Sequence, residues 1–305
     1  MSHCTEPELL GIDWGTSNRR AWWLGHDGTV LAEHSDAQGL LASQGRFEAA
    51  FDALLEAGPA LPPATPVLMS GMVGAASGWV EAPYLAASEP LTQLARRLCA
   101  VPAAGPRCFI VPGICFTGAD GRVDVMRGEE TQLLGALALG HGDGWYLLPG
   151  THSKWVQLLE GRVADLATYM TGELFALLTS HGTLASVAGP RDTNDDEQPQ
   201  AFARGVAAAA RSGLSNALFG CRAQVVAGRM PAGEARSHLS GLLIGAEWHD
   251  VVRRAGRAPQ QVTVIGAAAL AARHALVAEA LGCRITTLDS RSVQLAALQA
   301  LRAHL

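Results

Sequence analysis

The sequence predicts an α/β protein made of two domains of similar size. Its 305 residues exceed what one ordinary hydrophobic core organises. Hydrophobic residues make up 49% and charged residues 17%, which is typical of packed globular proteins. A strand–turn–strand–turn–strand pattern also occurs once near the start of each half. We therefore predict an N-terminal domain over residues 1–135 and a C-terminal domain over residues 136–305.

The two copies of this pattern share a Gly-Thr turn after their first strand. The first copy spans residues 9–32 with the turn at Gly15 and Thr16, and the second spans residues 145–169 with the turn at Gly150 and Thr151. Because each copy opens one half of the chain, we interpret the pair as an internal duplication. Two unrelated meanders are the alternative.

Helical and extended patterns alternate through the rest of both halves. Apolar spacing and flanking Gly or Pro residues predict helices at residues 47–55, 89–98, 129–139, 172–178, 201–218, 240–252 and 266–281, and after residue 288. Short apolar runs predict strands at residues 66–70, 108–111, 261–265 and 284–288.

Both Gly-Thr turns have the composition of phosphate-binding turns. Small residues let backbone N–H groups approach phosphate oxygens, and the hydroxyls of Thr16 and Ser17 add donors. Asp13 is suited to Mg²⁺ or its waters, whereas the alternative is an ordinary hairpin in which it bonds to local backbone. Two such turns facing across a cleft would hold a polyphosphate, with Lys154 as a further cation. A solvated lysine at a strand end is the alternative for Lys154.

Two other segments carry candidate chemistry. Gly266 joins a predicted strand to an Ala-rich helix, and adenine or ribose can lie against such a junction; close packing is the alternative. Glu129 and Glu130 stand at a predicted helix start, where acidic residues commonly interact with the helix dipole. Their functional interpretation is a general base or a ligand to a metal-bound water where the domains meet.

Composition and missing motifs argue against several other classes. The net charge of −5 disfavours nucleic acid or an anionic membrane as the main partner. None of the six cysteines has the C-x-x-C spacing of zinc or redox sites, so free thiols are expected. The chain has no P-loop, dinucleotide-binding, zincin or hydrolase motif. A polar start and the lack of a long apolar run predict a cytoplasmic protein.

Six blocks of sequence resemble one known family, the 2-dehydro-3-deoxygalactonokinases. The blocks lie at residues 13–18 with 20–22, 70–74 with 78–79 and 82–85, 125–136, 149–156, 171–174 and 239–247. The most specific are Met-Arg-Gly-Glu-Glu-Thr-Gln from residue 126 and Pro-Gly-Thr-His-Ser-Lys-Trp from residue 149. The chain departs from the family pattern at the expected adenosine turn, where residues 266–270 read Gly-Ala-Ala-Ala-Leu in place of Gly-Ser-Ser-Leu and lack the hydroxyls.

The resemblance implies a fold, a reaction and its cofactors. The implied fold is two RNase H-like domains of the actin/hexokinase type around an ATP cleft. The implied reaction is phosphorylation of 2-dehydro-3-deoxy-D-galactonate at its 6-hydroxyl by ATP with Mg²⁺, in galactonate breakdown. A homodimer is one option for the oligomeric state.

The resemblance also implies a set of site residues. Those expected to bind ATP are Gly15, Thr16, Ser17, Gly150, Thr151, His152, Lys154 and Gly266. Those expected to bind the sugar acid are Asn18, Arg20, Gly71, Met72, Trp79 and Arg127, with Arg20 or Arg127 on its carboxylate. Glu129 is expected to act as the base and Asp13 to hold the metal, while Glu130 and Asp13 stay open as alternative bases.

Three other functions are weighed against this interpretation. They are a kinase of another sugar or sugar acid on the same fold, a non-catalytic sugar or nucleotide sensor, and a phosphatase or polyphosphate hydrolase. The presence of both Asp13 and Glu129 disfavours a sensor, which would be free to lose them.

Overall fold

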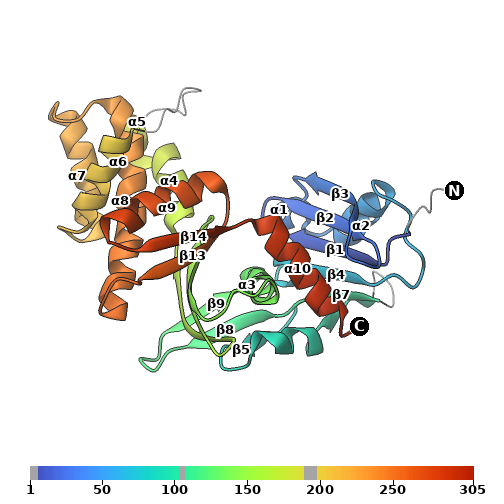
Figure 1. The fold of residues 1–305 in the computed structure, drawn as a ribbon. Helices are drawn as coiled ribbons and strands as arrows, with labels where there is room; N and C mark the ends of the chain where they lie inside the picture. The colour runs from blue at the N-terminus through green and yellow to red at the C-terminus, as the bar shows by residue number, and fades with distance from the viewer. Residues whose placement is uncertain (1–5, 103–106, 189–197) are drawn as a thin grey trace. The chain divides into compact units, whose positions relative to one another are not determined.

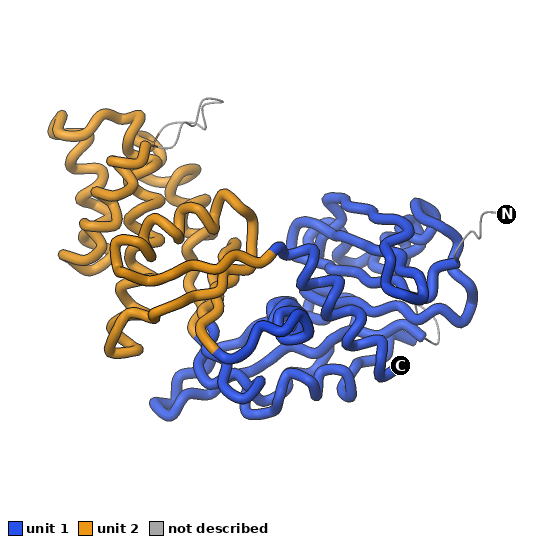
Figure 2. The backbone as a smooth tube through the Cα atoms, viewed as in Figure 1, with its two compact units in different colours: residues 1–143, 156–166, 289–305 blue, residues 144–155, 167–288 orange. Residues whose placement is uncertain are grey.

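The chain forms a mixed α/β fold with two compact units. A computed structural model describes residues 6–102, 107–188 and 198–305. Unit 1 comprises Met1–Asp143, Val156–Leu166 and Asp289–Leu305, and unit 2 comprises Gly144–Trp155 and Ala167–Leu288 (Figure 2).

These units differ from the single boundary predicted between residues 135 and 136. The C-terminal helix α10 (Ser290–Arg302) groups with unit 1 because it packs along α3 (Glu129–Ala138), as Figure 1 shows. Its Gln294 also donates a buried hydrogen bond of 3.0 Å to the hydroxyl of Ser70. Residues 156–166 join unit 1 through Val163, whose N–H donates to the Ala87 carbonyl at 3.2 Å. Contacts between residues far apart in the sequence therefore explain why α10 and residues 156–166 both belong to unit 1.

The main sheet of unit 1 has the strand order β3-β2-β1-β4-β7-β6. Its strands are β1 (Leu9–Trp14), β2 (Arg19–Leu24), β3 (Val30–Asp36), β4 (Val67–Gly71), β6 (Cys99–Ala100) and β7 (Cys108–Ile110). Strands β1, β4 and β7 are parallel, whereas β2 is antiparallel to β1 and to β3. The carboxyl ends of β1 and β4 therefore lie at the same edge, with Asp13 paired to Ser70.

The sheet formed by the second copy has the order β12-β11-β10-β13-β14. Its strands are β10 (Gly144–Leu148), β11 (Ser153–Leu159), β12 (Arg162–Tyr169), β13 (Gln261–Ile265) and β14 (Arg284–Leu288). Here too the third, second, first and fourth strands lie side by side in that order, and β10, β13 and β14 are parallel. This agreement supports the predicted duplication.

A smaller sheet in unit 1 was not predicted. It consists of β5 (Tyr84–Ala86), β8 (Gly113–Thr117) and β9 (Val123–Met126) in the order β5-β8-β9. Strands of three to five residues are too short to show a clear alternation of apolar and polar side chains.

Each unit buries its own hydrophobic core. In unit 1, helix α2 (Phe47–Glu56) presents Phe47, Ala50, Phe51 and Leu54 to a core that includes Trp14 and Trp23. Their spacing of three and four residues forms one apolar face of the helix. In unit 2, helix α8 (Ala232–Ala255) places Trp248 against Trp155 of the sheet, with ring centroids 4.6 Å apart.

Helices cluster in unit 2 around α8. They are α4 (Thr171–Ser180), α5 (Gly182–Ala188), α6 (Pro199–Ala209), α7 (Leu214–Val226) and α9 (Ala268–Ala280). Figure 1 shows α5, α6 and α7 beside α8, and the described residues of these four helices share a core that includes Leu239 and Leu242.

Most predicted elements agree with the structure within a few residues, but three differ. The helix predicted at residues 89–98 is a 3₁₀ helix, Leu91–Arg96, because Pro90 enters it in an extended conformation. The helix predicted at residues 201–218 is two helices, α6 and α7, because Gly213 is extended at ψ 148°. Helix α8 also begins at Ala232, eight residues before the predicted start at residue 240.

Five cysteines are free in the part of the chain that the structure describes, as predicted: Cys99, Cys108, Cys115, Cys221 and Cys283. Cys4 lies outside the described residues. None of the helices described combines the length and the apolar character needed to cross a bilayer.

Adjacent arginines on β2 have different surroundings. Arg19 is 2% exposed, and its guanidinium donates to Asp36 Oδ2 and to the Ala50 carbonyl, each at 2.6 Å. It also lies 4.7 Å above the ring of Trp14. Arg20 is exposed and pairs across the strands with Asp13.

We predict that Arg19→Ala lowers the free energy of unfolding by about 3 kcal/mol, because it leaves a mostly buried carboxylate without its cation. Arg20→Ala is the matched control and should change it by less than about 0.5 kcal/mol. Urea denaturation of both variants measures the difference. Equal losses of stability would contradict a structural role specific to Arg19.

Candidate functional site

Three chain segments meet at the carboxyl ends of β1 and β4 in unit 1. Gly71, which follows Ser70, has φ 90°, and a Cβ there would lie 2.8 Å from the Trp14 carbonyl and 3.5 Å from Asp13 Oδ1. Gly128, just before α3, has φ 108°, and a Cβ there would lie 3.2 Å from Gly71 Cα. Only glycine adopts such backbone angles readily, so these two residues bring the start of α3 beside Asp13.

Asp13 and Glu129 interact electrostatically at this point. Burial raises the pKa of Asp13 to about 6; the positive charge of Arg20 opposes this shift, and the negative charge of Glu129 adds to it. The carboxylate of Glu129 accepts a hydrogen bond from the backbone N–H of Arg127 at 3.0 Å. The structure therefore places the two acids of the predicted catalytic pair close to one another.

Glu130, the neighbour of Glu129 in the chain, is fully buried. Its carboxyl oxygens accept hydrogen bonds from the Gly128 N–H at 2.7 and 2.9 Å and from the Thr131 hydroxyl at 3.1 Å. Burial raises its pKa to about 8, and the charge of Glu129 adds to this effect. Glu130 therefore holds a proton at neutral pH and supports the turn that positions Glu129.

The two candidate arginines differ in exposure. Arg20 is exposed next to Asp13, whereas Arg127 is 8% exposed. Nη2 of Arg127 donates to the Ala82 carbonyl at 2.8 Å, and its guanidinium lies 4.2 Å above the ring of Tyr84. Arg20 is therefore the accessible cation of the pair, and Arg127 holds the segment around Tyr84 in place.

The first Gly-Thr turn is anchored through its carbonyl groups. The Leu40 N–H donates to the Gly15 carbonyl at 2.9 Å, and the Leu41 N–H donates to the Thr16 carbonyl at 3.1 Å. Thr16, Ser17 and Asn18 are exposed. Hydroxyl and amide groups are thus available to a ligand on a turn held from behind by α1 (Leu40–Ser43).

Met72 and Trp79 belong to the hydrophobic core of unit 1. The ring of Trp79 is stacked on Phe47, with centroids 6.4 Å apart, and meets Trp14 edge-on at 6.3 Å. Met72 packs against the same core. The segment after β4 folds back on itself, since the Trp79 N–H donates to the Val73 carbonyl at 2.8 Å. Both side chains therefore pack against the hydrophobic core next to the ends of β1 and β4. The sequence did not indicate this structural role.

The second Gly-Thr turn, in unit 2, packs against the start of α4. The Glu173 N–H donates to the Thr151 carbonyl at 2.9 Å, and the His152 ring lies 2.5 Å from the Glu173 carboxylate. A Cβ on Gly172 would lie 2.3 Å from the Gly150 carbonyl, so a side chain there would push the helix off the turn.

Lys154 is buried in β11, with 7% of its surface exposed. Its ammonium group donates to the Thr168 hydroxyl at 3.1 Å. The alternative of a solvated lysine is therefore wrong. That Lys154 binds an ATP phosphate stays a prediction.

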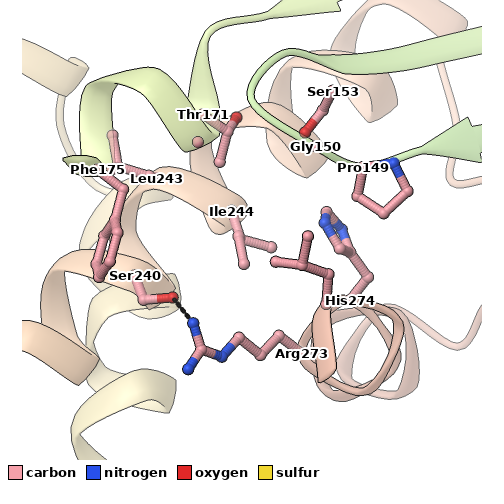
Figure 3. Close-up of a pocket in the computed structure, with 12 residues that line it drawn as sticks. Pro149, Gly150, Ser153, Thr171, Phe175, Ser240, Leu243, Ile244, Arg273 and His274 are labelled. Carbon is pink, nitrogen blue, oxygen red and sulfur yellow. Dashed lines mark hydrogen bonds between the residues drawn. The ribbon is translucent and has the colours of Figure 1, made fainter. Parts of the chain in front are cut away.

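A pocket in unit 2 joins this turn to three helices (Figure 3). It is lined by Pro149, Gly150, Ser153, Thr171, Gly172, Phe175, Ser240, Leu243, Ile244, Leu270, Arg273 and His274. Gly266 lies just behind it, since a Cβ there would be 3.1 Å from the Pro149 ring. Apolar walls with a few polar groups suit a flat heteroaromatic ring.

Sequence reasoning predicted the contribution of the turn and of the segment after Gly266 to this region. It missed the residues from α4 and α8 and also Arg273, which donates to the Ser240 hydroxyl at 3.4 Å (Figure 3). Several of these residues lie in the family-like blocks at residues 171–174 and 239–247, but only the packing of the helices shows that they line one pocket.

A bound Mg²⁺ would depend on few protein ligands. No cluster of three or more His, Cys, Asp or Glu side chains suited to a metal occurs among residues 6–102, 107–188 and 198–305. Mg²⁺ at phosphoryl-transfer sites is commonly held by one or two carboxylates, water and phosphate oxygens. The single carboxylate of Asp13 fits that donor set.

We predict that Glu130→Gln changes how stability depends on pH. The unfolded side chain loses its proton near pH 4.5, whereas the folded one keeps it to about pH 8. The stability that this proton provides is present below about pH 4.5 and is lost as the pH rises to about 8, at about 1.4 kcal/mol per pH unit. The variant cannot titrate, so its stability relative to the wild type should increase over this range.

Denaturant unfolding between about pH 5 and pH 8 measures this difference. Glu48→Gln is the matched control because Glu48 also lies in the first turn of a helix but is exposed. A difference between wild type and Glu130→Gln that stays constant with pH would show that Glu130 is ionised in the folded protein.

Known proteins of one family are similar to this chain over most of its length. A family model described as 2-keto-3-deoxy-galactonokinase matches residues 13–301. The chain is 36% identical over 280 residues to a 2-dehydro-3-deoxygalactonokinase of Escherichia coli strain K12, covering 91% of each chain. It is 38% identical over 300 residues to a Rhizobium meliloti strain 1021 protein of the same name, covering 95% of this chain and 94% of the relative.

Solved structures are similar as well. One from Sinorhizobium meliloti, described as a protein of the same kind, has a TM-score of 0.86 at 34% identity and covers 96% of this chain and 95% of its own. The activator of 2-hydroxyisocaproyl-CoA dehydratase from Clostridium difficile has a TM-score of 0.51 at 11% identity, covering 97% and 95%, which shows a similar fold alone. The extent of the family match and the identities over nearly the whole chain establish that the chain belongs to the 2-keto-3-deoxy-galactonokinase family.

Proposed function

We propose that this chain is an ATP-dependent kinase that phosphorylates 2-dehydro-3-deoxy-D-galactonate at its 6-hydroxyl in galactonate breakdown. The observation that carries this proposal is the meeting of Asp13, Arg20 and Glu129 at one sheet edge of a chain in this family. The relatives at 36% and 38% identity carry the name of this activity. The family match does not favour the sensor, the hydrolase or a kinase of another sugar.

Phosphoryl transfer depends mainly on positioning and on neutralising charge. In the proposed reaction, Glu129 accepts the proton of the 6-hydroxyl as the phosphoryl group arrives. Its carboxylate is oriented for this by the Arg127 N–H at 3.0 Å. Asp13 would hold Mg²⁺ or its waters, and the ion neutralises phosphate charge when bound.

The two Gly-Thr turns are proposed to bind the ATP phosphates. Each turn follows the first strand of a sheet, and the first four strands have the same order in both sheets. That repeat and the family membership support a fold of two RNase H-like domains of the actin/hexokinase type around an ATP cleft. The pocket near Gly266 would take the adenine ring through apolar contacts and backbone, because residues 267–269 are alanines without hydroxyls.

The sugar acid is proposed to bind at the exposed face of unit 1 near Asn18, Arg20 and Gly71. Its carboxylate needs a cation, and the exposure of Arg20 favours it over the buried Arg127. The absence of a nucleic-acid partner, a cytoplasmic location and a homodimer stay predictions.

An assay of ADP release over a panel of 2-keto-3-deoxy sugar acids tests the proposed function. The galactonate derivative should give the highest kcat/KM, and ADP should not form without an acceptor. A higher kcat/KM for an epimer would assign a different substrate. ADP release that does not depend on any sugar acid would indicate a hydrolase.

We predict that Glu129→Gln lowers kcat by a factor of about 10²–10⁴ at every Mg²⁺ concentration, because it removes the base. Asp13→Asn should instead shift the Mg²⁺ dependence, and Glu130→Gln should keep most activity. Steady-state kinetics with varied Mg²⁺ separates the three variants. An active Glu129→Gln with an inactive Glu130→Gln would reverse the roles within the pair. If both are active, Asp13 becomes the candidate base.

We predict that Arg20→Ala weakens sugar-acid binding by about 2–4 kcal/mol, because a charge-assisted contact is lost and the substrate charge is left unpaired. ATP affinity and the melting temperature should change little. Arg127→Ala should lower the melting temperature, because its guanidinium packs on Tyr84. Calorimetric titration with each substrate tests this; an Arg20→Ala variant that loses only ATP affinity would make Arg20 a phosphate ligand.

A further inference from the structure

A second buried carboxylate, Glu247 of α8, lies under the Gly-Thr turn of unit 2. Its side chain is 1% exposed. Oε1 accepts a hydrogen bond from the Trp155 indole N–H at 3.0 Å, and Oε2 accepts one from the Thr171 hydroxyl. The Ser153 hydroxyl also bonds to this carboxylate. One side chain therefore gathers donors from the end of the turn, from β11 and from the first residue of α4.

Glu247 reaches the pocket only through these partners. Ser153 and Thr171 both line the pocket, whereas Glu247 does not (Figure 3). The Glu173 N–H and Gly172 join the start of α4 to the turn from the other side. The position of the turn relative to the start of α4 thus depends on these backbone contacts and on the carboxylate of Glu247.

No cation compensates this carboxylate among the described residues near it. The ring nitrogen Nδ1 of His274 is 3.7 Å from Oε1, but it accepts a hydrogen bond from the Trp248 indole N–H at 3.0 Å. Burial lowers the pKa of His274 to about 3, so the ring is neutral at physiological pH. The hydroxyl and indole donors are therefore what stabilises Glu247, and in return Glu247 fixes where they lie.

We propose that Glu247 is a positioning residue that holds the Gly150–Ser153 turn against the start of α4 and thereby sets the affinity for the nucleoside triphosphate. The inference rests on the proposed function, in which this turn binds ATP phosphates. Without a full acceptor at Glu247, buried donors are left unpaired, and turn and helix lose their common anchor.

Glu247→Gln is the first test, because it keeps the shape but replaces one acceptor oxygen with an amide N–H₂. Binding of a non-hydrolysable ATP analogue, measured by calorimetry, should weaken about tenfold, as expected for the loss of a hydrogen bond to a charged group. The KM for the sugar acid should stay within about twofold, since that substrate is assigned to unit 1. Thr171→Val should weaken the analogue similarly, and Thr171→Ser should restore it.

Tyr169→Phe is the matched control. The Tyr169 hydroxyl donates to Asp250 on the same helix at 2.7 Å, so this variant also removes one hydroxyl–carboxylate bond to α8, but the bond is to Asp250 and not to Glu247. It should leave the affinity for the analogue unchanged. A loss as large as in Thr171→Val would mean that any loosening of α8 has this effect, and it would overturn the proposal.

A double-mutant cycle separates positioning from direct contact. If Thr171 acts through Glu247, the Thr171→Val/Glu247→Gln double variant should bind the analogue no more weakly than the weaker single variant. Additive losses, or normal binding by Glu247→Gln, would overturn the proposal. If Glu247→Gln does not fold, the comparison of Thr171→Val, Thr171→Ser and Tyr169→Phe still decides it. A wild-type protein that binds no ATP analogue would instead overturn the proposed function.

Discussion

The electrostatic interaction of Glu129 with both Asp13 and Glu130 is the constraint on which the candidate site depends. Glu129 would be repelled by both of the other carboxyl groups if all three were ionised. The structure lowers this repulsion by burying Glu130 so that it keeps its proton, and by pairing Asp13 across the strands with Arg20. Gly71 and Gly128 make the approach sterically feasible, because any side chain there would meet backbone atoms.

In unit 2, the buried Glu247 stabilises the Gly150–Ser153 turn in a way comparable to the role of Glu130 in unit 1. Glu130 accepts the Gly128 N–H and so orients the turn before α3, and Glu247 accepts the Thr171 hydroxyl at the start of α4. Burial raises the pKa of both side chains, to about 8 and about 7. In each unit the groups available to a ligand are therefore held by a carboxyl group that does not itself reach the surface.

The composition of the first turn and the family resemblance predicted that Asp13, Gly71 and Glu129 belong to one site. The parallel pairing of β1 and β4, which was not predicted from the sequence, is the physical reason that Asp13 lies beside the residues after β4. The sequence did not distinguish exposed from buried side chains within a motif: Trp79 and Lys154 lie in family-like blocks, but Trp79 packs against the core and Lys154 is buried. Glu247 ends the family-like block at residues 239–247, but it was given no role, because nothing near it in the sequence shows that it bonds to β11 and to the start of α4. The return of α10 to unit 1 depends on Gln294 and Ser70, which are 224 residues apart.

Titration of the Asp13 carboxyl by ¹³C NMR, in the free protein without Mg²⁺, tests the central claim most directly. The account predicts a pKa of about 6 in the wild-type protein and a lower pKa in Glu129→Gln, where the neighbouring negative charge is gone. A pKa near the ordinary value of 3.8 that Glu129→Gln leaves unchanged would contradict it, because the two acids would then not share one buried site.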